Sequence, residues 1–209
     1  MSQVAISGNA SGTGTLTIAA PNTNSNYTLT LPTATTTFVG TDATQTLTNK
    51  TIQGGAITSG TAVASTSGTS IDFTGIPSWV KRITVMFAGV STNGTSNIQI
   101  QIGAGSVETS GYLGASAVIS SGGNGFANYT AGFGVFTNAA TSTITGVMRI
   151  NLFGSNRWVA DASFGYENTG AIVTTGGQKT TSGTLDRIRI TTVNGTDTFD
   201  AGTINILYE

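Results

Sequence analysis

The chain has 209 residues, of which only 8% are charged, and its formal net charge at pH 7 is -1. Soluble proteins average about 25% charged residues, so hydroxyl and amide groups must cover most of this surface. The few Lys and Arg residues are scattered and form no basic patch for phosphate groups, which excludes nucleic acid as an expected partner. Because 38% of the residues are hydrophobic, the chain also differs from disordered proteins.

The residue content excludes several classes of site. The sequence has no Cys and no His, so the chain alone cannot form a disulfide, a zinc site with the usual ligands or a histidine-based catalytic triad. No cofactor is expected. The sequence shows neither a signal peptide nor a transmembrane span, and we expect synthesis in a cytoplasm without membrane insertion.

Residues 1–60 are predicted to form an extended β segment. Two short alternating runs, residues 15–18 and 27–31, are joined by a polar turn and followed by widely spaced apolar residues. A lone hairpin is marginally stable in water, so we expect three chains to wrap about one axis here, forming a homotrimer. The side chains expected to pack in this trimer are Leu16, Ile18, Leu29, Leu31, Phe38, Leu47 and Ile52.

Residues 61–209 are predicted to form one β-sandwich domain, jelly-roll-like in its connections. Gly, Thr, Ser and Asn interrupt every window that could form an amphipathic helix. Short alternating runs predict about eight to ten strands. Gly-rich stretches such as Gly122–Gly123 and Gly176–Gly177 are interpreted as breaks between strands. The whole chain is therefore predicted to be all-β.

The clearest strands in this domain are residues 81–90 and 97–102. In the second strand, isoleucines alternate with Gln99 and Gln101, which are expected to face outward. Between the two strands lies Asn93–Gly94, a dipeptide typical of tight hairpins. Asn194–Gly195 is interpreted as a hairpin turn in the same way.

Two parts of the chain resemble virion proteins of tailed bacteriophages. The run Thr46–Ile52, preceded by Gly40–Asp42, resembles a linker found in many tail-fibre proteins. A second set of stretches is similar to a C-terminal module of phage fibre-like proteins: Ser70–Pro77, Val80–Val85, Leu185–Ile190 and Asp200–Tyr208.

The resemblance implies a trimeric structural protein on the virion surface, assembled in the host cytoplasm. Its N-terminal part would attach to other virion proteins, and its C-terminal domain would project towards the host as part of a small tail fibre or spike. The alternative is a capsid decoration or head-fibre protein that stabilises the shell. An enzyme is not expected, because nothing in the sequence shows that Glu108, Asp161 and Glu167 converge as a glycosidase pair does.

A host-surface glycan is the expected ligand if the domain binds one. Sugar faces stack on aromatic rings, and sugar hydroxyls pair with amides and hydroxyls. The candidate contacts come from two stretches that combine both kinds of side chain: Trp158, Tyr166 and Asn168, with Phe126, Asn128 and Tyr129. Aromatic residues of β proteins are more often core than ligand platforms, so both interpretations stay open. Trp79, which follows Ile76–Pro77, is expected to be a packing residue.

Two smaller groups of charged residues are also considered. Arg187 and Arg189 share a strand face near Lys179 in the sequence, which is interpreted as a solvated face rather than a binding patch. Asp197 and Asp200 lie near Asn194, but no full set of calcium ligands is visible. No metal site is therefore predicted.

Overall fold

The computed structural model describes residues 11–13, 22–26, 57–137 and 139–209. The chain divides into two units, Met1–Lys50 and Thr51–Glu209. In the first unit, the backbone N–H of Ser25 donates to Oγ1 of Thr23 at 3.1 Å. The seven side chains predicted to pack in a trimer lie outside the described residues, so the fold below is that of the second unit.

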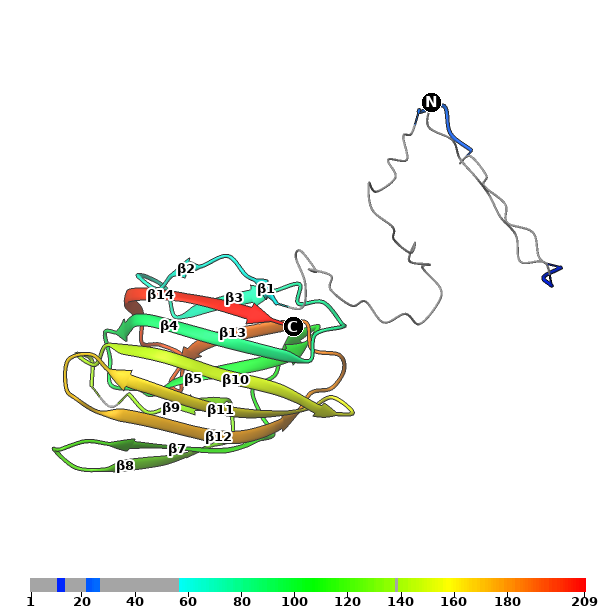
Figure 1. Cartoon of the computed structure of the whole chain (residues 1–209). Coiled ribbons are helices and arrows are strands. Elements are labelled where there is room, and N and C mark those ends of the chain that lie inside the picture. Colours follow the sequence, from blue (N-terminus) through cyan, green and yellow to red (C-terminus); the bar gives the residue numbers. More distant parts are fainter. Residues whose placement is uncertain (1–10, 14–21, 27–56, 138) are drawn as a thin grey trace. The chain divides into compact units, whose positions relative to one another are not determined.

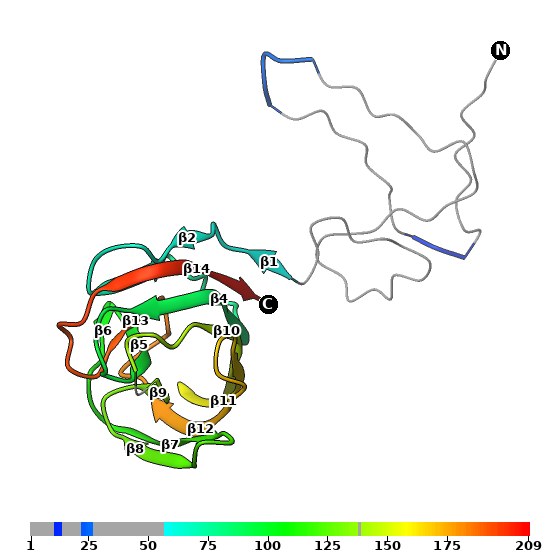
Figure 2. The ribbon, with the colours of Figure 1, turned by 90° about the vertical axis from the view of Figure 1, so that its left-hand side faces the viewer.

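The second unit is a sandwich of two antiparallel sheets (Figure 1). Over the described residues it contains no helix, and hence none that is long and apolar enough to cross a membrane. The prediction of an all-β chain with a β-sandwich domain is confirmed. Figure 2 shows the larger sheet curving from β14 past β10 to β7, around the smaller sheet.

The larger sheet has nine strands and the smaller sheet has five. Across the larger sheet the order is β1 (Thr58–Ser59), β14 (Phe199–Tyr208), β4 (Arg82–Thr92), β10 (Ile144–Gly154), β11 (Arg157–Tyr166), β12 (Ile172–Thr180), β7 (Tyr112–Ile119) and β8 (Gly125–Tyr129), and β2 (Val63–Ala64) also pairs with β14. Across the smaller sheet the order is β3 (Ser70–Thr74), β13 (Arg187–Thr192), β5 (Ile98–Ala104) and β6 (Ser106–Val107), and β9 (Phe133–Val135) also pairs with β5.

The two predicted hairpins are arches between the sheets. Asn93–Gly94 joins β4 of the larger sheet to β5 of the smaller one, and Asn194–Gly195 joins β13 to β14 in the reverse sense. The hairpin prediction was wrong because Asn–Gly turns suit both hairpins and arches between sheets. Which of the two forms depends on the strands that pair with the flanking strands, and these come from distant parts of the chain. The two arched strand pairs run antiparallel through both sheets, β14 beside β4 and β13 beside β5, as paired strands do in a jelly roll.

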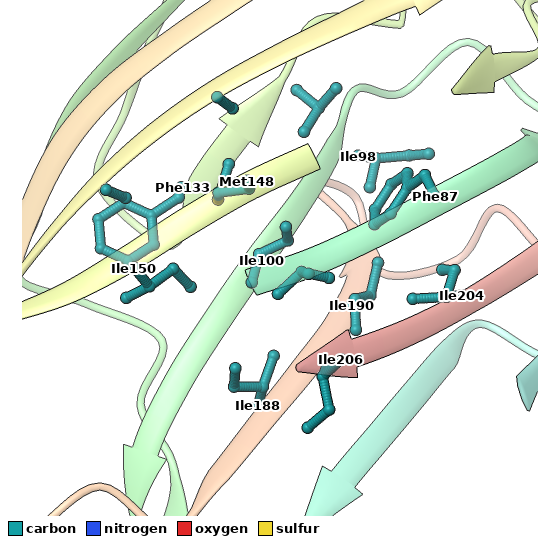
Figure 3. Packing of buried hydrophobic residues seen from close by; sticks show 14 of the residues in the cluster. Phe87, Ile98, Ile100, Phe133, Met148, Ile150, Ile188, Ile190, Ile204 and Ile206 are labelled. Carbon is teal, nitrogen blue, oxygen red and sulfur yellow. The ribbon is translucent and has the colours of Figure 1, made fainter. Parts of the chain in front are cut away.

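The core lies between the sheets and takes one face of nearly every long strand. In β11, buried and more exposed side chains alternate along the whole strand, as expected for a strand with one face in water. Each isoleucine buried in this way contributes about 1.5–3 kcal/mol. Figure 3 labels core side chains from both sheets: Phe87, Met148, Ile150, Ile204 and Ile206 from the larger, and Ile98, Ile100, Phe133, Ile188 and Ile190 from the smaller.

Gly176–Gly177 was predicted to break a strand but lies inside β12. Gly177 faces the core opposite Gly114 of β7. A Cβ at Gly177 would lie 3.0 Å from Cα of Gly114 and 3.1 Å from Cδ1 of Phe133. The glycine therefore makes room for an aromatic ring of the other sheet, which is a packing role that local sequence does not reveal.

Gln99 and Gln101 face outward on β5 as predicted, yet both are buried. The connection between β8 and β9 covers them. The side-chain amide of Gln101 donates to the carbonyl of Ala131 at 2.9 Å, and Gly132 packs against Gln99. The outer side of the smaller sheet is thus partly covered by the chain itself.

Candidate ligand site at one end of the sandwich

A cavity of about 480 Å³ opens at one end of the β domain. Its walls come from three connections: β7 to β8, β9 to β10, and β11 to β12. None of the lining side chains that the structure describes carries a charge. The polar lining groups are hydroxyls and one amide, from Ser120, Ser121, Asn124, Thr141, Ser142 and Thr169.

Hydrogen bonds between the walls hold this cavity in shape. The side-chain amide of Asn168 donates to the carbonyl of Thr141, which ties the β11–β12 turn to the β9–β10 connection. The hydroxyl of Tyr166 donates to the carbonyl of Phe136 in the same connection. Two of the three walls, the β9–β10 and β11–β12 connections, are therefore joined by direct contacts.

The chemistry of the lining suits a neutral, hydroxyl-rich molecule. Hydroxyl groups both donate and accept hydrogen bonds, as sugar hydroxyls do. Val118, Ala171 and the edge of the Tyr166 ring form the apolar part of the lining, and all three side chains are largely buried. The volume falls in the range of about 300–1,000 Å³ that is usual for small-molecule sites.

The cavity lies at the end of the domain opposite to the point where the chain enters it. Thr58 of β1 pairs with Tyr208, which pairs with Ile83 near the start of β4. Tyr166 in the cavity wall is aligned, through β10, with Val90 near the end of β4. The strand between these two rows spans about 23 Å, and Figure 1 shows the β7–β8 turn and β1 at opposite ends.

The structure brings part of the predicted glycan site together at this cavity. Tyr166 lines it, and the amide of the exposed Asn168 closes one wall. Asn124, which lies shortly before the predicted Phe126 in the sequence, lines it too. The serine and threonine hydroxyls of the walls were not predicted, because they belong to separate connections that only the fold brings together.

The remaining candidate residues lie elsewhere. Trp158 is only 3% exposed, and Tyr129 is also buried, with its ring against Gly134 and its hydroxyl 3.1 Å from Oγ of Ser116. Buried rings cannot offer a face to a sugar, so neither is retained as a contact. Phe126 and Asn128 are exposed on β8.

The alternation of β11 is a signal that could have separated these cases. Trp158 and Tyr166 are an even number of residues apart, so they share one strand face. The charged Arg157 and Asp161 occupy the other face, which places both aromatic rings inward. The edge of Tyr166 reaches the cavity because this residue ends the strand.

Trp79, expected to be a packing residue, does pack against a neighbouring ring but is 53% exposed. Its ring lies 5.9 Å from that of Tyr208, at an angle of 49° between the two planes. It therefore covers the last strand of the domain at the end where the chain enters, and leaves much of its own surface in water.

The predicted basic group does not form a patch. Lys179 points into the protein, where its Nζ lies 2.6 Å from Oε2 of Glu108 and 5.5 Å from the centre of the Tyr112 ring. Arg189 pairs with Asp72 through two hydrogen bonds of 2.7 and 2.6 Å. The guanidinium is thus neutralised across β3 and β13.

Glu108 is anchored by several donors. Its Oε1 accepts hydrogen bonds from the backbone N–H and the hydroxyl of Ser182 at 2.8 and 2.9 Å. Burial alone would raise the pKa of Glu108, but the hydrogen bonds from Lys179 and Ser182 outweigh it and hold the pKa below its ordinary value. Burial raises the pKa of the neighbouring Tyr112 hydroxyl.

The carboxylates weighed as a catalytic pair are far apart. Asp161 and Glu167 are separated by roughly 20 Å along β11, more than the roughly 5–9.5 Å of a glycosidase pair. Asp161 accepts a hydrogen bond of 3.0 Å from Nε of Arg149, and Glu167 accepts one from the hydroxyl of Thr145.

The acidic residues near Asn194 stabilise the arches. Asp197 accepts hydrogen bonds from the side chain of Asn194 at 2.6 Å and from the backbone N–H of Ser96 at 2.9 Å, which together lower its pKa. Asp200 accepts one from the hydroxyl of Ser91. Within the described part of the chain, no group of three or more acidic residues is placed to hold a metal ion.

A scan against protein-family models found no match for this chain. Searches of curated proteins and of solved structures found no match either.

Proposed function

We propose that this chain is a non-enzymatic structural protein of a tailed-bacteriophage virion, a small tail-fibre or spike component. Its β domain binds a neutral saccharide of the host surface in the cavity at the end of the sandwich. The proposal is supported by the position of this uncharged, hydroxyl-lined cavity, opposite to the end where the chain enters the domain. A domain attached on its N-terminal side would present such a cavity outward.

The resemblance of Thr46–Ile52 to a tail-fibre linker supports the same proposal from the sequence. A trimer would carry three such cavities. Several weak sites on one particle raise the apparent affinity by about 10²- to 10⁴-fold when they engage together, so a single site need not bind tightly.

A glycan array probed with the full chain tests the saccharide proposal. Gly122 lines the cavity, and a Cβ there meets no atom closer than 4.0 Å, so the variant Gly122→Tyr brings a bulky side chain to the cavity without a clash at its Cβ. Thr196→Tyr is the matched control, because Thr196 is exposed in an arch and is not part of the lining.

We expect the wild-type chain and Thr196→Tyr to bind the same neutral saccharides. Binding by Gly122→Tyr should fall at least tenfold. Equal binding by all three proteins would contradict the assignment of the cavity, and an absence of binding by the wild-type chain would contradict the saccharide proposal itself.

A further inference from the structure

We propose that the outward face of β7, together with the adjoining faces of β8 and β12, binds a second copy of this chain. We call this surface the β7 face. The inference goes beyond the proposed function, because it requires neither a saccharide nor a particular place in a virion.

The first observation is that the outward face of β7 is apolar, although this face lies in water in the single chain. Tyr112 and Val118 point into the core, while the outward positions are Leu113, Ala115, Ala117 and Ile119. A strand with one face in water normally alternates apolar and polar side chains, and a strand covered on both faces has a continuous apolar run. The outward face of β7, which carries only apolar side chains, therefore has the composition of a covered face.

The neighbouring strands extend this apolar surface. Phe126 of β8 pairs with Ala117, and Ile172 of β12 pairs with Ile119. Phe126 is 85% exposed, and Ile119 and Ile172 are about 60% exposed. With Leu113, these side chains offer on the order of 500 Å² of apolar surface, at the upper end of what isolated monomers show.

The charge on the β7 face points to an identical partner. β7 and β8 contain no charged residue, and Lys179, the charged residue of β12, points inward. A surface can meet its own copy without repulsion only if it is neutral or internally balanced. The apolar area is more than half of the roughly 800 Å² that each partner contributes to a standard interface. Ala115 and Ala117, which lie between Leu113 and Ile119, leave room for the β7 faces of two chains to approach each other.

The edge of the sheet supports the same partner. Among the described strands, β8 pairs on one side alone, with β7. Charged residues and Pro usually keep an edge strand from pairing with another chain. Gly125–Tyr129 contains neither. The other end of the sheet is extended by β1 and β2.

Single cysteines test whether the β7 face is covered, since the chain has none of its own. Thr174→Cys places a thiol on the β7 face, because Thr174 is exposed beside Ala117. Thr196→Cys is the matched control in an exposed arch. In the full chain, we expect a maleimide to react at least tenfold more slowly at position 174 than at position 196, and at equal rates after denaturation.

A second measurement identifies what covers the face. In Asn128→Cys, the new thiol at the rim of the β7 face is labelled with a benzophenone. Chains of natural isotope composition and chains labelled with nitrogen-15 are then unfolded and refolded together. We expect photo-cross-links that join heavy to light chains. Equal maleimide rates in the folded protein would overturn the proposal, and so would cross-links confined to single chains.

Discussion

Removing the half-buried carboxylate of Glu108, the partner of the buried Lys179, should destabilise the β domain. In Glu108→Gln, Lys179 remains buried at 7% exposure without its anionic partner. The ring of Tyr112 at 5.5 Å offsets only part of this loss. Breaking a buried pair on one side costs about 3–5 kcal/mol, and since the glutamine oxygen can still accept from Ser182, we expect about 3 kcal/mol.

Urea unfolding followed by tryptophan fluorescence measures this cost, because Trp158 pairs with Lys179 across β11 and β12. For a domain of this size the expected loss corresponds to about 6–12 °C in Tm. Adding Lys179→Met should restore much of the stability, because an apolar pair replaces the unpaired cation. The control Asp161→Asn breaks an exposed pair and should have little effect.

The effect should also depend on pH in a defined direction. The folded-state pKa of Glu108 is lowered from 4.5, so its contribution to stability is fully present above pH 4.5 and is lost as pH falls through the lower folded value. The difference between wild type and Glu108→Gln should therefore shrink at low pH. A difference below about 1 kcal/mol at pH 7, or one that is unchanged at low pH, would refute the reasoning.

Two further predictions concern close contacts in the sandwich. Gly134→Ala should lower the free energy of unfolding in urea by about 1–3 kcal/mol, because its Cβ would lie 2.1 Å from Cζ of Tyr129. The control Gly165→Ala has open space around its Cβ and should leave the stability unchanged. Equal stability of the two variants would show that the Tyr129 ring moves away freely. Asp197→Ala should speed hydrogen exchange of the Ser96 amide, because this N–H donates a hydrogen bond of 2.9 Å to the Asp197 carboxylate. Unchanged exchange would mean that other contacts in the arch protect that amide.

Side-chain alternation made the strands and the sandwich predictable, and the limits lay in contacts between distant residues. The isoleucines of β5 predict a strand with its apolar face in the core, which the structure confirms, but burial of Gln99 and Gln101 on the other face was not predicted. Asn93–Gly94 predicts a turn. That this turn forms an arch between the sheets depends on pairing with β13 and β14, which lie about a hundred residues further along the chain. Gly177 was misjudged because the ring that occupies its space belongs to β9.

The cavity was only partly predictable for the same reason. Tyr166 and Asn168 were singled out by residue type, and both contribute to it. The hydroxyls of Ser120 and Thr141 belong to separate turns, and only the folded sandwich brings them together. Trp158 is aromatic like Tyr166, but it does not reach the cavity, because the alternation of β11 places it in the core.

The location of the protein on the phage particle tests the central proposal most directly. Gold-labelled antibodies raised against the β domain, applied to intact virions and viewed by electron microscopy, would give it. We predict gold at the tail, on fibres or a spike. Gold distributed over the capsid would favour the decoration protein instead, and particles without the protein would contradict a structural role in the virion.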